Sequence, residues 1–217
     1  MMFFAAKGPT TTSYIWTDPL SRVAEVIQRT GRHYEYDLLW AIAEKAPEGI
    51  YFDVGAHVGN HTSFFALECP STKVIAVEPH QETVGFLRQT VARNQIEDKV
   101  QIVPAAIHND WQGCQVESTN DRRRIITNAT QATPCLRLDD LVTAGEKAAL
   151  IKADVDGLEA SVLLSGERLI KRDHPLLALE AWTPETEESI RAVLEPWGYV
   201  QGPRYCATPT HIWEWHG

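Results

Sequence analysis

The chain has 217 residues, a formal net charge of −9, and a composition of 44% hydrophobic and 23% charged residues. This composition is ordinary for a globular protein with one full core, and the negative charge argues against general binding of nucleic acid. No stretch approaches the ~20 apolar residues of a membrane helix, and the four cysteines are scattered without a CxxC pair. We therefore expect a cytoplasmic protein without a membrane span, a zinc site or a disulfide framework.

The first part of the chain is predicted to be helical. Apolar residues recur at helical spacing in residues 21–31 and again in residues 33–46. The first of these helices is expected to stop at Gly31, because glycine is favoured just beyond helix ends. We interpret residues 1–33 as an N-terminal helical arm or lid, and residues 34–217 as a single domain.

From residue 49 onward, strand-like apolar runs alternate with helical patterns. Strands are expected at residues 49–54, 73–79, 99–107, 148–154 and 174–182, and helices at residues 60–68, 81–94, 158–170 and 184–198. Near-continuous apolar strands bounded by helices indicate a parallel sheet covered on both faces. Residues 111–141 are expected to form a β excursion, and residues 198–205 and 210–217 an antiparallel hairpin. The predicted fold is α/β, a doubly wound, mostly parallel seven-stranded sheet with a C-terminal antiparallel hairpin.

The stretch YFDVGAHVGN, residues 51–60, is a strand followed by a glycine turn and a helix. Such a turn binds anionic or nucleotide-like groups, because free backbone N–H groups point outward at the helix start. A P-loop would need GxxxxGK[ST], which is missing from the sequence. A dinucleotide turn would need GxGxxG, but His57 takes the place of the second glycine, and Asp53 would repel a pyrophosphate. The turn therefore disfavours ATP and NAD.

S-adenosyl-L-methionine fits this turn better, because it has no phosphates. Its ammonium would be attracted to Asp53, and its carboxylate could accept hydrogen bonds from the N–H groups of the turn. Glu78 ends the next strand, 23 residues after Gly55, near the ~20 residues expected for a carboxylate that binds ribose hydroxyls. NAD enzymes share this last feature, so the argument depends on the whole set.

Five segments together resemble the FkbM family of S-adenosylmethionine-dependent methyltransferases, over roughly residues 34–205. They are FDVGAHVGNHTSFFA, VIAVEPHQETVGFLRQTVARNQ, VQIVPAAIHND, LRLDDL and LIKADVDGLEASVLLSG. The resemblance implies a class I methyltransferase (Rossmann-like) fold and O-methylation of hydroxyls on sugars or natural products. Where this chain has His57 the family more often has Asn, and KADVDG stands where the family more often has KIDVEG.

The resemblance maps Asp53, Gly55, Gly59 and Asn60 onto the cofactor turn and Glu78 onto the ribose site, and it implies that Ala105 and Ala106 lie near the adenine. The cofactor-binding residues that we predict are Asp53, Gly55, Ala56, His57, Gly59, Asn60, Glu78, Pro79, Ala105, Ala106 and Asp154. We expect Asn60 also to cap the helix that follows the turn.

Asp154, which ends the strand at residues 148–154, is the predicted general base for a hydroxyl acceptor. A hydrogen bond from Asp154 to the cofactor's ammonium is the alternative, and Glu180, at the end of the next strand, is the second candidate for the base. Asp156 and Glu159 form the sequence pattern of an acidic capping box, with Asp156 as the cap.

We expect no catalytic metal. His57 and His61 are four residues apart but lack a carboxylate in HExxH register, and the strand at residues 174–182 is not followed by an Asp-Asn pair. The basic run Arg122–Arg124 fits a solvated loop or strand edge, or else a clamp for an anionic substrate.

Other functions stay open at this stage. A methyltransferase-like module that binds the cofactor without turnover and an N-methyltransferase are both compatible with the residues, since an amine needs no strong base. The sequence leaves the acceptor and the oligomeric state undetermined.

Overall fold

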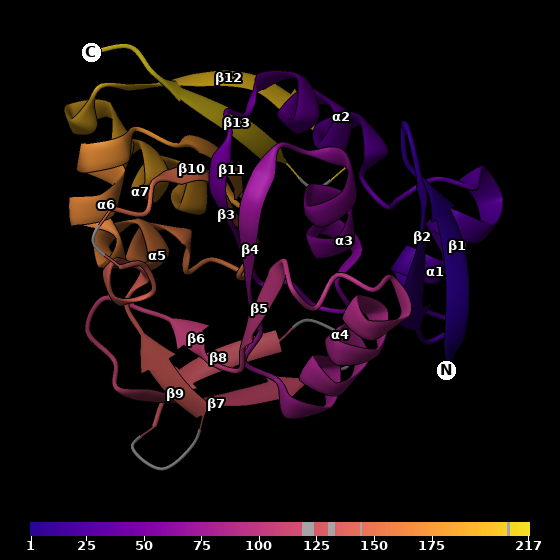
Figure 1. Cartoon of the computed structure of the whole chain (residues 1–217). Helices are drawn as coiled ribbons and strands as arrows, with labels where there is room; N and C mark the ends of the chain where they lie inside the picture. Colours follow the sequence, from indigo (N-terminus) through magenta and orange to yellow (C-terminus); the bar gives the residue numbers. More distant parts are fainter. Residues whose placement is uncertain (119–123, 130–132, 144, 208) are drawn as a thin grey trace.

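The computed structural model describes residues 1–217 except 119–123, 130–132, 144 and 208 (Figure 1). Its centre is a seven-stranded sheet with the strand order β12-β13-β11-β10-β3-β4-β5. The strands are β3 (Gly49–Val54), β4 (Ser71–Val77), β5 (Val100–Val103), β10 (Ala148–Ala153), β11 (Leu176–Glu180), β12 (Tyr199–Tyr205) and β13 (Thr210–Trp215). Six of them point in the same direction, and β13 alone is reversed, antiparallel to both of its neighbours. The predicted mostly parallel sheet with a C-terminal hairpin is confirmed, and the sheet is mixed.

Helices cover both faces of this sheet (Figure 1). One face carries α2 (Tyr36–Lys45), α3 (Asn60–Glu68) and α4 (Gln81–Arg93), and the other carries α5 (Glu159–Ser165), α6 (Glu167–Asp173) and α7 (Pro184–Leu194). Successive strand residues alternate between the two faces. Tyr51 and Leu150 therefore lie in one buried cluster, and Phe52 and Ile151 in the other. Burial of each such side chain stabilises the fold by ~1.5–3 kcal/mol.

Two predicted elements are interrupted. The predicted strand at residues 99–107 breaks after Val103, and the next two residues in strand form pair with a different sheet. The predicted helix at residues 158–170 divides at Gly166, whose position leaves 3.0 Å between an added Cβ and the Cβ of Leu138. The second half has its own anchor, because Asp139 Oδ1 accepts a hydrogen bond of 2.9 Å from Leu169 N.

The predicted β excursion is confirmed as a second, four-stranded sheet beneath β5 (Figure 1). It contains β6 (Ala106–Ile107), β9 (Thr133–Leu136), β7 (Gly113–Ser118) and β8 (Arg124–Asn128), in that order. Arg122 and Arg123 of the basic run lie outside the described residues, and Arg124 opens β8. The interpretation of this run therefore stays a prediction.

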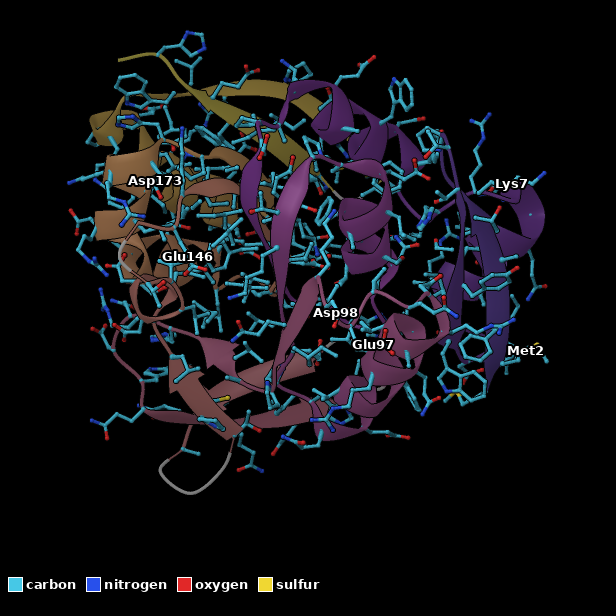
Figure 2. The ribbon with its side chains drawn as sticks, in the orientation of Figure 1. Met2, Lys7, Glu97, Asp98, Glu146 and Asp173 are labelled. Carbon is cyan, nitrogen blue, oxygen red and sulfur yellow. The ribbon has the colours of Figure 1, made fainter. Side chains whose placement is uncertain are left out.

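The N-terminal arm is only partly helical, which corrects the expectation for residues 1–33. Helix α1 (Arg22–Thr30) ends at Gly31 as expected, but an antiparallel hairpin of β1 (Met2–Lys7) and β2 (Thr12–Thr17) precedes it. Figure 2 places Met2 and Lys7 on the outermost strand, at the edge of the molecule. The hairpin packs on the outside of α4, where Trp16 N donates a hydrogen bond of 3.0 Å to Thr90 Oγ1.

Among the described residues, the helices are all too short or too polar to cross a membrane.

Candidate active site

Most of the predicted site residues lie at the carboxyl ends of parallel strands, where open α/β sheets bind ligands. Lys152 of β10 is paired in register with Asp53 of β3, and Ala153 with Leu179 of β11. The next residues, Asp154 and Glu180, therefore end neighbouring strands. The two-residue period of a strand points all four polar side chains to the face covered by α2, α3 and α4.

Two glycines allow the turn after β3 to pack closely. Gly55 has a φ of +79°, and an added Cβ would lie 2.0 Å from the carbonyl oxygen of Asp154. Gly59 has a φ of +86°, and an added Cβ would lie 2.7 Å from Leu87 Cδ1 of α4. His57 between them is exposed and has a φ of 50°, a conformation that is uncommon for residues other than glycine. At both positions the backbone conformation and the close contact with a neighbouring segment require a residue without a side chain.

Asn60 does not cap α3, contrary to the sequence-based expectation. The cap position belongs to Gly59, and Asn60 is the first helical residue. The Asn60 side chain instead holds the backbone of Tyr34: Oδ1 accepts a hydrogen bond of 3.1 Å from Tyr34 N, and Nδ2 donates one of 3.0 Å to Tyr34 O. Asn60 thus joins the start of α3 to the segment between α1 and α2.

Glu78 is held at the turn by backbone hydrogen bonds. Only 3% of the residue is exposed, and its two carboxylate oxygens accept from His57 N and from His80 N, each at 3.0 Å. Each carboxylate oxygen can accept a second hydrogen bond. Next to it, a narrow apolar pocket is lined by Val54, Gly55, Val77, Pro79, Ala105, Ala106, Ile107, Val155 and Leu158. The predicted adenine and ribose residues are therefore neighbours.

Lys152 is a site residue that sequence reasoning missed. Its ammonium lies 3.5 Å from Asp53 Oδ1, 3.5 Å from Asp154 Oδ2 and 3.5 Å from the carbonyl oxygen of Gly55. Lysine is almost never fully buried without a partner, so a lysine inside the apolar run AALIKAD was the available signal. Asp53 is fully buried and also accepts a hydrogen bond of 2.5 Å from Thr62 Oγ1. Asp53 therefore contacts the site only by way of the Lys152 ammonium, whose charge it partly balances.

Asp154 and Glu180 form a carboxyl pair. The two side chains are hydrogen-bonded to each other, which requires one of them to carry a proton, since a carboxylate only accepts. Burial first, and then the charge of Asp154, raise the pKa of Glu180. Burial works in the same direction on Asp154, but Lys152 and the hydrogen bond from Glu180 outweigh it and lower the pKa of Asp154. Glu180 is thus the protonated member.

The predicted capping box of Asp156 and Glu159 is not formed. Leu158 occupies the cap position of α5, and Asp156 has a φ of 54°. Glu159 Oε1 instead accepts hydrogen bonds from Val155 N (3.0 Å) and Gly157 N (3.4 Å), so the turn after β10 folds around this carboxyl group. Burial raises the pKa of Glu159 to about 7.

A larger pocket lies between the N-terminal arm and the segments that follow β11 and β12. Arg32, Tyr34, Glu35 and Tyr36 line one wall, and Trp182 and Cys206 line another. Burial first, and then the charges of Glu35 and Asp154, raise the pKa of Tyr34. Sequence reasoning did not find Glu35, because its partner His61, 3.2 Å away, comes from α3.

His57 and His61 lie in different surroundings. His61 contacts Glu35, while His57 is exposed. The described part of the chain contains no group of three or more His, Cys, Asp or Glu residues suited to a metal ion.

The strand order, the antiparallel β13 and a ligand pocket at the strand ends define a class I methyltransferase fold. The Methyltransferase FkbM domain model matches residues 53–200, and the chain therefore belongs to this family of methyltransferases. Members of this class generally use S-adenosylmethionine.

Several solved methyltransferase structures are similar to this chain. The methyltransferase FkbM from Methylobacillus flagellatus KT is 17% identical with a TM-score of 0.58, and the match covers 77% of this chain and 44% of that one. Precorrin-6y C5,15-methyltransferase from Geobacter metallireducens GS-15 is 14% identical with a TM-score of 0.51, covering 83% and 87%. The M1A22 tRNA methyltransferase TrmK of B. subtilis is 15% identical with a TM-score of 0.53, covering 82% and 65%.

At these identities the similarity shows the fold alone, and the chain spans less than half the length of the first of these proteins. No curated protein matches the sequence.

Proposed function

We propose that the protein transfers the methyl group of S-adenosylmethionine to a hydroxyl of a sugar or another small metabolite. The observation that carries this proposal is the position of the Asp154–Glu180 pair. Val155, the next residue after Asp154, lines the narrow apolar pocket, while Trp182, two residues after Glu180, lines the larger one. A carboxylate at the junction of a cofactor pocket and an acceptor pocket is suited to proton transfer.

The residues present fit the cofactor. The narrow apolar pocket suits the adenine, and Glu78, next to it, is a carboxylate of the kind that accepts hydrogen bonds from ribose hydroxyls. Glu180 Oε2 is a buried acceptor without a hydrogen-bond partner in the described part of the chain, which suits a ligand with N–H donors such as the methionyl ammonium. When bound, the cofactor supplies an electrophilic methyl group on a sulfonium.

Asp154 performs the acid–base chemistry in this proposal. A neutral hydroxyl is a poor nucleophile until its proton is leaving, and a positioned carboxylate that accepts the proton contributes typically ~10²–10⁴-fold. The Asp154 side chain is 36% exposed, so it can reach an acceptor and afterwards release the proton to solvent. Glu180, which donates a hydrogen bond to it, holds its orientation.

The test compares Asp154→Asn with the wild type and with Asp98→Asn. Asp98 is exposed and lies just before β5, at the amino end of this strand, whereas the site lies at the carboxyl ends (Figure 2). We expect Asp154→Asn to keep the fold and to bind S-adenosylhomocysteine within about tenfold of the wild type, because the cofactor contacts of the turn remain. Turnover should fall by at least ~10², while Asp98→Asn should match the wild type.

The assay measures S-adenosylhomocysteine release with pools of hydroxylated and amine acceptors. Normal turnover of Asp154→Asn on a hydroxyl would remove Asp154 as the base, and turnover on amines alone would favour N-methylation. Cofactor binding by the wild type without turnover on any acceptor would instead favour a binding module.

A further inference from the structure

We propose that Lys152 is a positioning residue for the Asp154–Glu180 pair: it keeps the shared proton on Glu180 and holds the Asp154 carboxylate at the edge of the site. The catalytic consequence rests on the proposed function. The arrangement of charges does not, because it can be measured in the protein without turnover.

The location of Lys152 follows from the strand order. Strand β10 lies between β3 and β11, so a side chain near its end can reach residues of both neighbours. Only 2% of the Lys152 side chain is exposed, and a buried ammonium is stable only with partners. Its three oxygen partners, on Asp53, Gly55 and Asp154, are all 3.5 Å away. Since direct N–H···O bonds are mostly 2.7–3.2 Å long, Lys152 acts as a central charge shared by the turn and the pair.

Two adjacent carboxyl groups hold one proton between them, because both cannot be ionised at close range. The surroundings of this pair are unequal. Lys152 contacts Asp154, whose side chain is 36% exposed, whereas only 5% of Glu180 is exposed. Ionisation is favoured next to a cation and near solvent. Both influences leave the charge on Asp154 and the proton on Glu180.

The remaining groups around Lys152 keep this balance. Asp53 comes from β3, Glu35 from the segment before α2, and His61 from α3; Glu159 of α5 adds a weaker influence on the pair. With Glu180 protonated, three carboxylates (Glu35, Asp53 and Asp154) face Lys152 and His61. Without the lysine this buried cluster would be strongly anionic, and the proton affinity of Asp154 would rise.

The consequence for the reaction is that Asp154 is ionised before the acceptor binds. As the acceptor oxygen forms its bond to the methyl carbon and the carbon–sulfur bond breaks, the hydroxyl proton passes to Asp154. The pair then carries two protons, and one leaves through the exposed side of Asp154. Lys152 exchanges no proton, and for this reason it is a positioning residue.

The test is a carbon-13 NMR titration of the carboxyl carbons in the intact protein, with signals assigned from Asp154→Asn and Glu180→Gln. In the wild type we expect Glu180 to titrate at a higher pH than Asp154. In Lys152→Met the midpoint of Asp154 should rise by at least about one pH unit, because an opposite charge at ~4 Å lowers a carboxyl pKa by about 1–3 units. Lys152→Arg should restore most of the difference.

The matched control is Lys99→Met, whose lysine donates a hydrogen bond of 2.6 Å to Ala66 O away from the pair; it should leave both midpoints unchanged. An unchanged Asp154 midpoint in folded Lys152→Met would overturn the proposal. If that variant does not fold, the titration of the wild type still tests the proposal. A midpoint of Glu180 at a lower pH than that of Asp154 would contradict it.

The pH dependence of kcat is a second test, because it should not change if Lys152 only stabilises the fold. The acidic limb of the kcat profile should shift upward by about one pH unit in Lys152→Met and return in Lys152→Arg. A wild type that fails to bind S-adenosylhomocysteine would refute the proposed function, while the NMR result would stand independently.

Discussion

Gly55 is the residue at which the cofactor turn and the end of β10 come closest. An added Cβ would meet the carbonyl oxygen of Asp154 at 2.0 Å, and the backbone there has a φ of +79°. A side chain at such a position costs about 1–2 kcal/mol from the left-handed conformation alone, and the clash with backbone adds to this cost. The obstacle is backbone rather than a flexible side chain, so it cannot simply rotate away.

We therefore expect Gly55→Ala to lower the free energy of unfolding by at least about 2 kcal/mol, measured by urea denaturation. The matched control is Gly85→Ala in α4, where an added Cβ meets nothing within 4 Å. That substitution should stabilise the protein by up to about 1 kcal/mol, because alanine is the better helix former. Equal effects of the two substitutions would contradict this account of the turn.

At the scale of residues, sequence reasoning found what a local motif encodes. The glycine turn and Glu78 could be predicted because a strand, a turn and a helix follow one another in the chain. Lys152 and Glu35 could not, since their partners come from other elements: Asp53 from β3 for Lys152, and His61 from α3 for Glu35. Such pairings are created by strand order and helix docking.

At the scale of elements, the N-terminal hairpin is held by one carboxylate of α3. Glu68 accepts hydrogen bonds from the backbone N–H and the hydroxyl of both Thr10 and Thr11, at 2.6 to 3.0 Å. Partial burial acts to raise the pKa of Glu68, but these four hydrogen bonds outweigh it and lower the pKa. The ionised carboxylate therefore fastens the turn of the hairpin to the end of α3.

A depressed carboxyl pKa stabilises the folded state above the unfolded value, and this contribution is lost as the pH falls through the folded value. We expect Glu68→Gln to speed amide hydrogen exchange in β1 and β2 at neutral pH while exchange in β3 and β10 stays slow. Lowering the pH below the unfolded pKa of ~4.3 should reduce the difference between variant and wild type. Glu97→Gln, in the exposed segment after α4 (Figure 2), is the control and should change nothing. Equal exchange rates in Glu68→Gln and wild type would contradict the anchoring role.

The strands that are buried on both faces of the sheet could be predicted from the sequence. Strands β3 and β10 are buried at every position, and short continuous apolar runs that alternate with helical patterns are typical of strands inside a parallel sheet. The hairpin was missed because β2 alternates buried and partly exposed residues over only six positions, and β1 does so less regularly. The break at Gly166 was missed because it depends on Leu138 and Asp139, which are distant in sequence.

At the scale of the whole molecule, the proposed cofactor site joins the two halves of the fold. The narrow pocket is built from β3, β4, the strand β6 of the second sheet and the turn before α5. A ligand that binds there contacts segments from residue 54 to residue 158. Such a ligand stabilises the native state alone, because the unfolded chain does not bring these segments together.

We expect S-adenosylhomocysteine at about 100 times its dissociation constant to stabilise the fold by ~2.7 kcal/mol. For a domain of this size the melting temperature should rise by several degrees, at about 2–4 °C per kcal/mol. NAD and ATP should give little shift, since Glu78 and the carboxyl pair lie at the site and the turn lacks both phosphate motifs. A scanning calorimeter or a dye-based melt measures all three ligands.

The Glu78→Ala variant shows whether the shift comes from this site. Loss of the hydrogen bonds to the ribose hydroxyls should weaken S-adenosylhomocysteine binding by roughly 1–3 kcal/mol, so the same ligand concentration should produce a smaller shift. Glu78 also holds His57 N and His80 N, so the melting temperature of the free variant must be measured first and subtracted. A ligand-induced shift in Glu78→Ala equal to that of the wild type would mean that the ribose is bound elsewhere. A larger shift with NAD than with S-adenosylhomocysteine in the wild type would overturn the assignment of the cofactor, because a turn without a dinucleotide motif would then bind a pyrophosphate.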